Sequence, residues 1–255
     1  MNANVPSPPA APAAAARAQT DASRASAKAD GSTPSPEGAL PSELTQIRAL
    51  LRQRQFPAAL AAAEAVLARA PQQRDALLFA AIAQRNLGRI AEAFRTLEVL
   101  QQAHPRFSRL HEERGHCHVA RREAPPAIES FEKAVSLNNA LPASWSMLEG
   151  LYRMTGKAAE AEMAAGQFAT LRNIPPEVVA ATSLYLDGDL DAAEPMVRQY
   201  LLKHGDHVEA MRLLARIGMA RKEFEDAELL LAAVLQIAPE YRAARLEYAE
   251  VLVEL

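Results

Sequence analysis

The feature that most constrains this chain is a column of six alanines at a nearly fixed interval. Four of them stand 34 residues apart, and after a shortening of two residues the last two resume the same interval: Ala59, Ala93, Ala127, Ala161, Ala193 and Ala227. A fixed period of about 20 to 50 residues is the signature of a repeat architecture. The interval therefore predicts stacked copies of one structural unit.

Two further columns share this period. Four residues after each alanine stand Ala63, Leu97, Phe131, Ala165, Val197 and Leu231. Twelve residues after each alanine stand residues that end helices, namely Pro71, Pro105, Asn139, Asn173, Gly205 and Pro239. Apolar residues recur at helical spacing from Leu44 onward without strand-like alternation, and aromatic residues make up only 5% of the chain. The sequence therefore predicts an all-α fold.

Over residues 40–255, these columns resemble the tetratricopeptide repeat (TPR). A large apolar residue at repeat position 4 is supplied by Leu77, Trp145 and Met211. A small residue at position 8 is supplied by Ala81, Gly115, Ala181, Ala215 and Ala249. At position 15, Gly88, Gly156 and Gly188 can adopt the left-handed conformation that ends a first helix. The resemblance implies an α-solenoid of about six helix pairs plus one terminal helix, wound as a right-handed superhelix.

We place the repeat units at 40–73, 74–107, 108–141, 142–173, 174–207 and 208–241, with a partial unit at 242–255. Residues 1–41 are rich in Ala, Pro and Ser and are predicted to form a disordered tail, because they cannot bury enough apolar surface. Ser42 is the expected N-cap of the first helix, so that the solenoid covers 42–255. The apolar last residues, up to Leu255, indicate either a fragment of a longer protein or an edge that a partner covers, and we favour the fragment.

Charge and composition exclude several classes of function. The chain has 28 basic and 31 acidic residues and a net charge of −3, which predicts neither a nucleic-acid nor a membrane partner. Its single cysteine, Cys117, rules out an intrachain disulfide. The N-terminus lacks the pattern of a signal peptide, so we expect a cytoplasmic protein.

No motif predicts catalysis, a cofactor or a metal within this chain. His111 and His118 share a helix face but fall at packing positions of the repeat, and His116 points elsewhere. We interpret this cluster as core or semi-buried histidines, with a metal or pH-sensing role as the alternative. Asp187-Gly188-Asp189 is interpreted as an inter-helix turn, because no distal Glu completes a calcium loop. We therefore predict that the chain by itself is not an enzyme.

The resemblance implies a concave groove lined by positions 2, 5, 9, 12 and 13 of the first helices. The candidate groove residues are Arg85, Asn86, Arg109, His116, Arg153, Met154, Tyr185, Arg212, Arg216 and Met219. They make the expected groove mildly basic, with apolar and Met patches, which suits an extended peptide or an amphipathic helix with acidic groups. Ile82 and His116 stand where the chaperone-binding subfamily has Asn, which argues against a cochaperone role.

Two functions remain open at this point. The first is a protein-interaction scaffold whose groove binds a protein or peptide partner, in an oligomeric state that the sequence leaves open. The second is the substrate-recruiting N-terminal region of a larger bacterial enzyme, because residues 187–252 are similar to TPR arrays that precede a sulfotransferase domain. The phosphate loop of sulfotransferases is absent from this chain, so that no catalytic residue carries over. Continuation of the coding sequence beyond Leu255 would distinguish the two.

Overall fold

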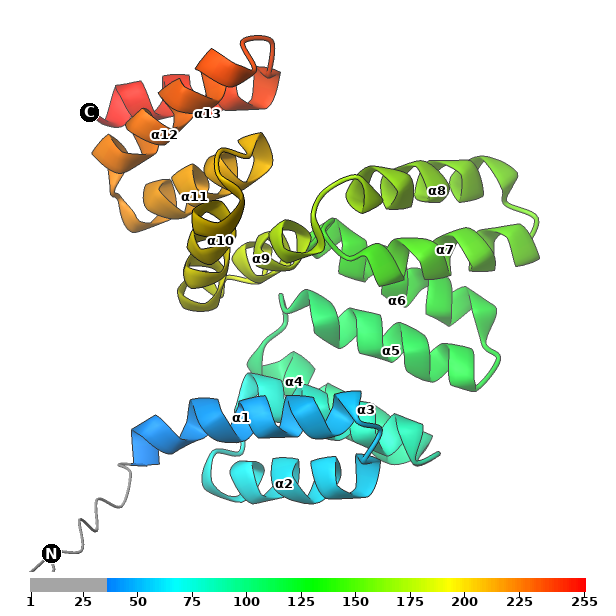
Figure 1. Ribbon diagram of the computed structural model, residues 1–255. Helices are drawn as coiled ribbons and strands as arrows, with labels where there is room; N and C mark the ends of the chain where they lie inside the picture. Colours follow the sequence, from blue (N-terminus) through cyan, green and yellow to red (C-terminus); the bar gives the residue numbers. More distant parts are fainter. Residues whose placement is uncertain (1–35) are drawn as a thin grey trace, which may run out of the picture. The chain divides into compact units, whose positions relative to one another are not determined.

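The computed structural model describes residues 36–255, which form helices and turns without any strand. The helices are α1 (Pro36–Arg52), α2 (Phe56–Arg69), α3 (Arg74–Asn86), α4 (Ile90–Ala103), α5 (Ser108–Ala120), α6 (Ala124–Leu137), α7 (Pro142–Met154), α8 (Ala158–Arg172), α9 (Pro176–Leu186), α10 (Leu190–His204), α11 (Val208–Arg221), α12 (Phe224–Ile237) and α13 (Arg242–Glu254). The predicted all-α fold is confirmed: six helix pairs are followed by one further helix (Figure 1).

The first helix begins at Pro36 and therefore starts before the expected N-cap, Ser42. Leu40 packs against the first core cluster, which gives the additional turn an apolar contact and explains its formation. Residues 1–35, which hold most of the predicted tail, lie outside the described residues.

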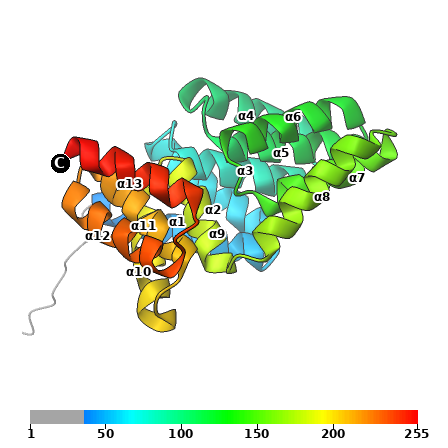
Figure 2. The same cartoon turned by 90° about the horizontal axis from the view of Figure 1, so that it is seen from above.

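Within each pair, the two helices pack side by side, and the pairs follow one another in chain order (Figures 1 and 2). The first helices of neighbouring pairs also contact one another: α1 with α3, α3 with α5, α9 with α11, and α11 with α13. The core is accordingly divided into clusters that each join neighbouring helices along the array. This is the stacking expected for a solenoid, in which each pair buries its apolar face against the next.

The alanine column is buried, and one of its members lies against the paired helix: a Cβ atom built on Gly218 of α11 would lie 3.6 Å from the Cβ atom of Ala227 on α12. All six alanines are at most 2% exposed: Ala59, Ala93, Ala127, Ala161, Ala193 and Ala227. The same tight fit recurs on the first helices, where a methyl group built on Gly115 would lie 2.8 Å from the ring of Phe131. Small side chains at these positions therefore allow the two helices of a pair to pack closely.

The turns within the pairs share one backbone conformation. The predicted left-handed glycines have φ angles of +79° at Gly88, +75° at Gly156 and +80° at Gly188. In the other three pairs, the same position is held by Arg54, Arg122 and Lys222, with φ angles of 60° to 64°. The repeat therefore imposes this conformation even on residues for which it costs about 1 kcal/mol.

The packing of consecutive helices is interrupted once in the described chain. Consecutive helices pack on one another throughout residues 36–255 except at α8 and α9. The helix that follows this break, α9, has 11 residues, whereas α7 and α11 have 13 and 14. The two-residue shortening of the repeat interval therefore lies within α9.

Two glycines allow the left-handed turn to be tested without any steric effect. A Cβ atom added at Gly156 or at Gly166 would meet no atom within 4 Å, but only Gly156 has a positive φ angle. We expect Gly156→Ala to lower the free energy of unfolding by about 1 kcal/mol, because it strains the backbone. Gly166→Ala, in the middle of α8, should raise it by about 0.5 to 1 kcal/mol. Urea unfolding of both variants measures the difference, and equal effects would contradict a strained turn.

Candidate binding groove

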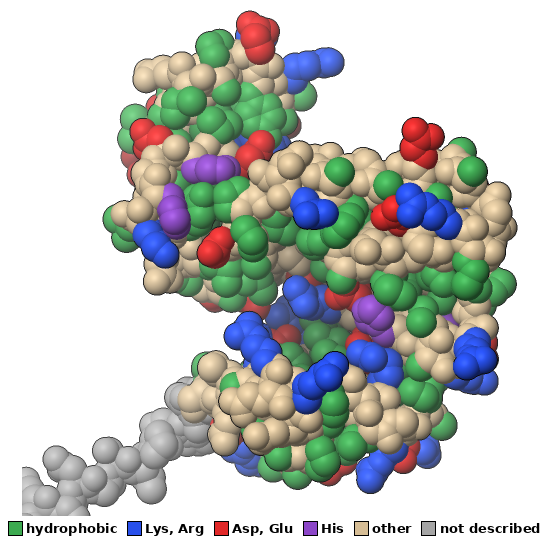
Figure 3. All heavy atoms as spheres, turned by 45° about the vertical axis from the view of Figure 1, so that its right-hand side comes forward, with side chains coloured by type: hydrophobic (Ala, Val, Ile, Leu, Met, Phe, Trp, Pro, Cys, Tyr) green, Lys and Arg blue, Asp and Glu red, His purple; other side chains and the backbone are tan. Residues whose placement is uncertain are grey.

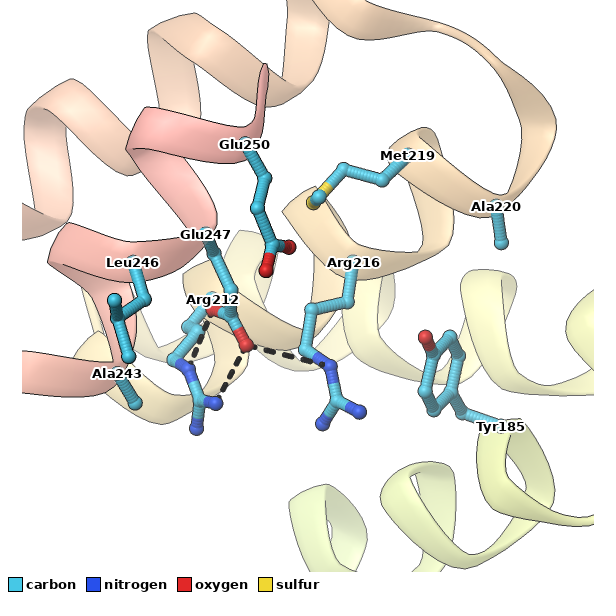
Figure 4. Close-up of a pocket in the computed structure, with 9 residues that line it drawn as sticks. All are labelled: Tyr185, Arg212, Arg216, Met219, Ala220, Ala243, Leu246, Glu247 and Glu250. Carbon is cyan, nitrogen blue, oxygen red and sulfur yellow. Dashed lines mark hydrogen bonds and ion pairs between the residues drawn. The ribbon is translucent and has the colours of Figure 1, made fainter. Parts of the chain in front are cut away.

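A cleft of about 570 Å³ lies between the first helices of the last three repeat units, α9, α11 and α13. Its lining residues are Tyr185, Arg212, Arg216, Met219, Ala220, Ala243, Leu246, Glu247 and Glu250 (Figure 4). Four of the ten groove residues predicted from the sequence therefore come together here: Tyr185, Arg212, Arg216 and Met219. The other six do not line this cleft.

The residues that α13 contributes were missed by the sequence analysis. Ala243, Leu246 and Glu250 stand at repeat positions 2, 5 and 9 of the partial seventh unit, which are groove positions. The positional rule that identified the other candidates would have found them if it had been applied to this unit. The groove therefore includes the last helix of the array.

Arg212 holds two helices of the groove together. Its Nε and Nη2 atoms donate to the two carboxylate oxygens of Glu247 at 2.7 and 2.6 Å, and its Nη1 atom donates to the hydroxyl of Tyr241 at 2.9 Å. Burial alone would lower the pKa of Arg212, but the pair with Glu247 outweighs it and the pKa lies above its usual value. Arg212 on α11 is thus committed to a bidentate bridge to α13.

Arg216 is held differently. Its guanidinium lies over the ring of Tyr185, 4.6 Å from the ring centre, and its Nε atom is 3.6 Å from the Oε1 atom of Glu247, beyond hydrogen-bonding distance. This cation–π contact restrains the guanidinium while leaving its N–H donors for another acceptor. Beside it, Glu250 extends into the cleft (Figure 4).

An apolar wall completes the cleft. Met219 on α11 and Leu246 on α13 both line it, and the Leu246 side chain is 67% exposed. In the space-filling view, apolar side chains lie among the charged ones over much of the visible face (Figure 3). The cleft thus offers one oriented cation, one free carboxylate and an apolar surface.

Three of the four predicted groove residues of α3 and α5 interact mainly with the protein itself. Arg85 donates to Glu113, with 2.5 Å between Nε and Oε1, and Asn86 donates to the carbonyl of Ile82 at 2.8 Å. Burial raises the pKa of Glu113 to about 7, although Arg85 opposes this shift. His116 packs edge-on against Phe131, and burial lowers its pKa to about 4.

Of the remaining three candidates, Arg153 and Met154 are adjacent at the end of α7, and Arg109 lies on α5. Arg153 pairs with Glu149 one turn away on its own helix, with 2.7 Å between Nη2 and Oε1. Met154 is 70% exposed at the end of α7. Arg109 lines a second cleft, of about 480 Å³, together with residues of α7, α8 and α9.

The histidine cluster lies on the face that its spacing predicted. His111 and His118 line a cleft of about 630 Å³ between α5 and α6, and Nδ1 of His118 is 2.7 Å from a carboxylate oxygen of Glu123. His111 is buried, which lowers its pKa, and Cys117 is buried with its pKa raised to about 12. Within residues 36–255, no three His, Cys, Asp or Glu side chains are grouped so as to hold a metal ion.

None of the helices described here is both long and apolar enough to cross a bilayer. This observation concerns residues 36–255 only.

Several solved structures resemble the chain at low sequence identity. The structure titled as a functional characterization of Pseudomonas aeruginosa pilF has 16% identity and a TM-score of 0.50, over 86% of this chain and 99% of that one. TTC0263, a TPR protein of Thermus thermophilus, has 20% identity and a TM-score of 0.42, over 84% and 98%. A chain from the structure of Naa15/Naa10 bound to HypK-THB has 16% identity and a TM-score of 0.48, over 83% and 39%. The present chain thus spans less than half of that last relative.

A comparison with curated protein sequences found no match. The family model described as "Tetratricopeptide repeat" matches residues 44–108 and 178–242, which together make up half of the chain. With the helix pairs and the buried alanine column, this match identifies the chain as a member of the tetratricopeptide repeat family.

Proposed function

We propose that this protein is an interaction scaffold that binds an extended segment or an amphipathic helix of a partner protein in the cleft between α9, α11 and α13. The main support for this proposal is the position of the Arg216 guanidinium. It lies over the ring of Tyr185 and lines the same cleft as the apolar side chains of Met219 and Leu246. Tetratricopeptide repeat proteins are commonly interaction scaffolds, which supports this class of function.

The ion pairs narrow down the chemistry of the partner. Arg85, Arg153 and Arg212 are neutralised by glutamates of the chain, so that they add little to the basic character expected of the groove. Arg216 retains donors for a carboxylate, and the adjacent wall suits an apolar side chain. The partner segment that fits is therefore one with an acidic residue next to an apolar one.

The size of the cleft is consistent with such a segment. A volume of about 570 Å³ lies within the range of about 300 to 1,000 Å³ that small-ligand pockets occupy. A few side chains of a peptide fill such a space, while the rest of the segment continues along the first helices. The two anchoring side chains then carry most of the binding free energy.

Arg216→Gln tests the proposed anchor. Peptides selected from a displayed random library on the whole chain should bind the variant at least about 10-fold more weakly in calorimetric titration, because one charge-assisted hydrogen bond is lost. Arg153→Gln is the matched control, since it removes an exposed arginine of α7 that does not line the cleft. Equal affinity of the selected peptides for wild type and Arg216→Gln would reject this cleft as the site.

Arg212 should stabilise the groove instead of binding the ligand directly. In a double-mutant cycle of unfolding free energies, Arg212→Ala and Glu247→Ala should show a coupling of about 1 to 3 kcal/mol, because the pair is bidentate and less than a quarter exposed. The same cycle on Arg153 and Glu149 should give at most about 0.5 kcal/mol, because Arg153 is mostly exposed. Similar couplings for the two pairs would contradict a structural role for Arg212.

A further inference from the structure

The end of α9 and the turn that follows it make three polar contacts with helix pairs far away in the sequence. Ser183, Asp187 and Asp189 contact, respectively, Asn138, Ser108 and Arg74. The partners belong to helix pairs that precede α9, whereas the contacting segment spans fewer than ten residues. Such contacts lie outside the nearest-neighbour packing that holds a repeat array together.

Asp187 caps a helix of another unit. Its Oδ1 atom accepts a hydrogen bond from the backbone N–H of Ser108 at 3.1 Å, across 79 residues of sequence. Ser108 is the first residue of α5, and the residue before it, Phe107, provides no side-chain cap. A carboxylate is favoured there because the N–H groups at a helix start lack partners and the helix dipole is positive.

Asp189 has two partners. Its Oδ2 atom accepts from Nη2 of Arg74, at the start of α3, at 2.9 Å, and its Oδ1 atom accepts from the N–H of Ala192 at the start of its own helix, at 3.2 Å. Arg74 in turn lies over the ring of Phe107, 4.7 Å from the ring centre. The starts of α3 and α5 thus form one surface that binds two carboxylates.

Asn138 supplies the third contact and is completely buried. Its Nδ2 atom donates to both the carbonyl and the hydroxyl oxygen of Ser183 at 3.0 Å, and its Oδ1 atom accepts from the N–H of Ala140. A buried amide with all these groups paired specifies a single docked position for α9.

The packing around these contacts is incomplete. Clefts of about 280, 480 and 440 Å³ lie along α9 and its turn, and α8 and α9 lack the extensive packing of other consecutive helices. One core cluster joins α6, α7 and α8, and the next joins α9, α10 and α11. The contact therefore resembles an interface between two stacks more than a continuous core.

We propose that the turn Asp187–Asp189 is a latch. It occupies a carboxylate-binding surface at the starts of α3 and α5 and thereby docks the stack α9–α13 on the stack α1–α8. When this surface is vacated, the two stacks swing apart about the connection 173–175.

The test combines Asp187→Ala with Asp189→Asn in the whole chain. The asparagine keeps the cap of α10, since Asn caps helices as well as Asp, but it loses the charge that Arg74 binds. Spin labels on Ala91→Cys in α4 and Leu229→Cys in α12 report the distance between the stacks by pulsed electron paramagnetic resonance. Cys117 is buried, so that labelling is confined to the two introduced cysteines.

We expect one narrow distance distribution for the otherwise unchanged chain and a broader, longer one for the latch variant. Helicity by circular dichroism should stay constant. Asp206→Asn, at an exposed aspartate between α10 and α11, is the matched control and should leave the distribution narrow. An unchanged distribution in the latch variant would overturn the proposal.

Asp187→Ala alone provides a second measurement if the double variant unfolds. The backbone N–H of Ser108 should exchange with solvent at least about 10-fold faster in this variant, because its acceptor is lost. Unchanged exchange at Ser108 would equally reject the latch. Neither measurement depends on Arg216, so that failure of the latch and failure of the proposed groove are distinguishable.

Discussion

The close approach of two helices over small side chains is the contact on which the rest of this structure depends. All six alanines of the repeat column are buried between paired helices, and Gly115 plays the corresponding part on α5. Small residues allow short helices to pack closely enough to bury their apolar faces, which a single pair is too small to do alone. The groove on the first helices exists because this packing repeats with a constant geometry.

The periodic part of the fold could be predicted because its causes are local and recur. The alanines, the residues that end helices and the left-handed glycines each serve the same purpose in successive units, so that their spacing reveals the architecture. Arg54, Arg122 and Lys222 show that the geometry also holds where the favourable residue is missing. The interrupted stacking at α9 was visible only as a two-residue shortening of the interval, whose structural effect depends on distant partners such as Arg74.

The candidate groove could be predicted only in part. Repeat positions predict which side chains face the groove, but they do not predict which of these side chains form ion pairs within the protein. Arg85, Arg153 and Arg212 are paired with glutamates that lie on the same or a neighbouring helix, and only the three-dimensional arrangement shows this. We propose Arg216 as the binding arginine because it lies over the ring of Tyr185 and is incompletely paired. The sulfotransferase-associated role and the cytoplasmic location stay predictions.

The unfolding free energies of matched alanine variants test most directly whether small side chains hold the helix pairs together. Ala93→Val and Ala127→Val enlarge buried column residues, whereas Ala61→Val and Ala91→Val enlarge exposed residues on the same kind of helix. We expect each buried variant to lose about 1 to 3 kcal/mol of unfolding free energy, because the two added methyl groups push the paired helices apart. The exposed variants should lose no more than about 0.7 kcal/mol, the helix-propensity cost of valine. Equal losses at buried and exposed positions would contradict the claim that small side chains hold the helix pairs together.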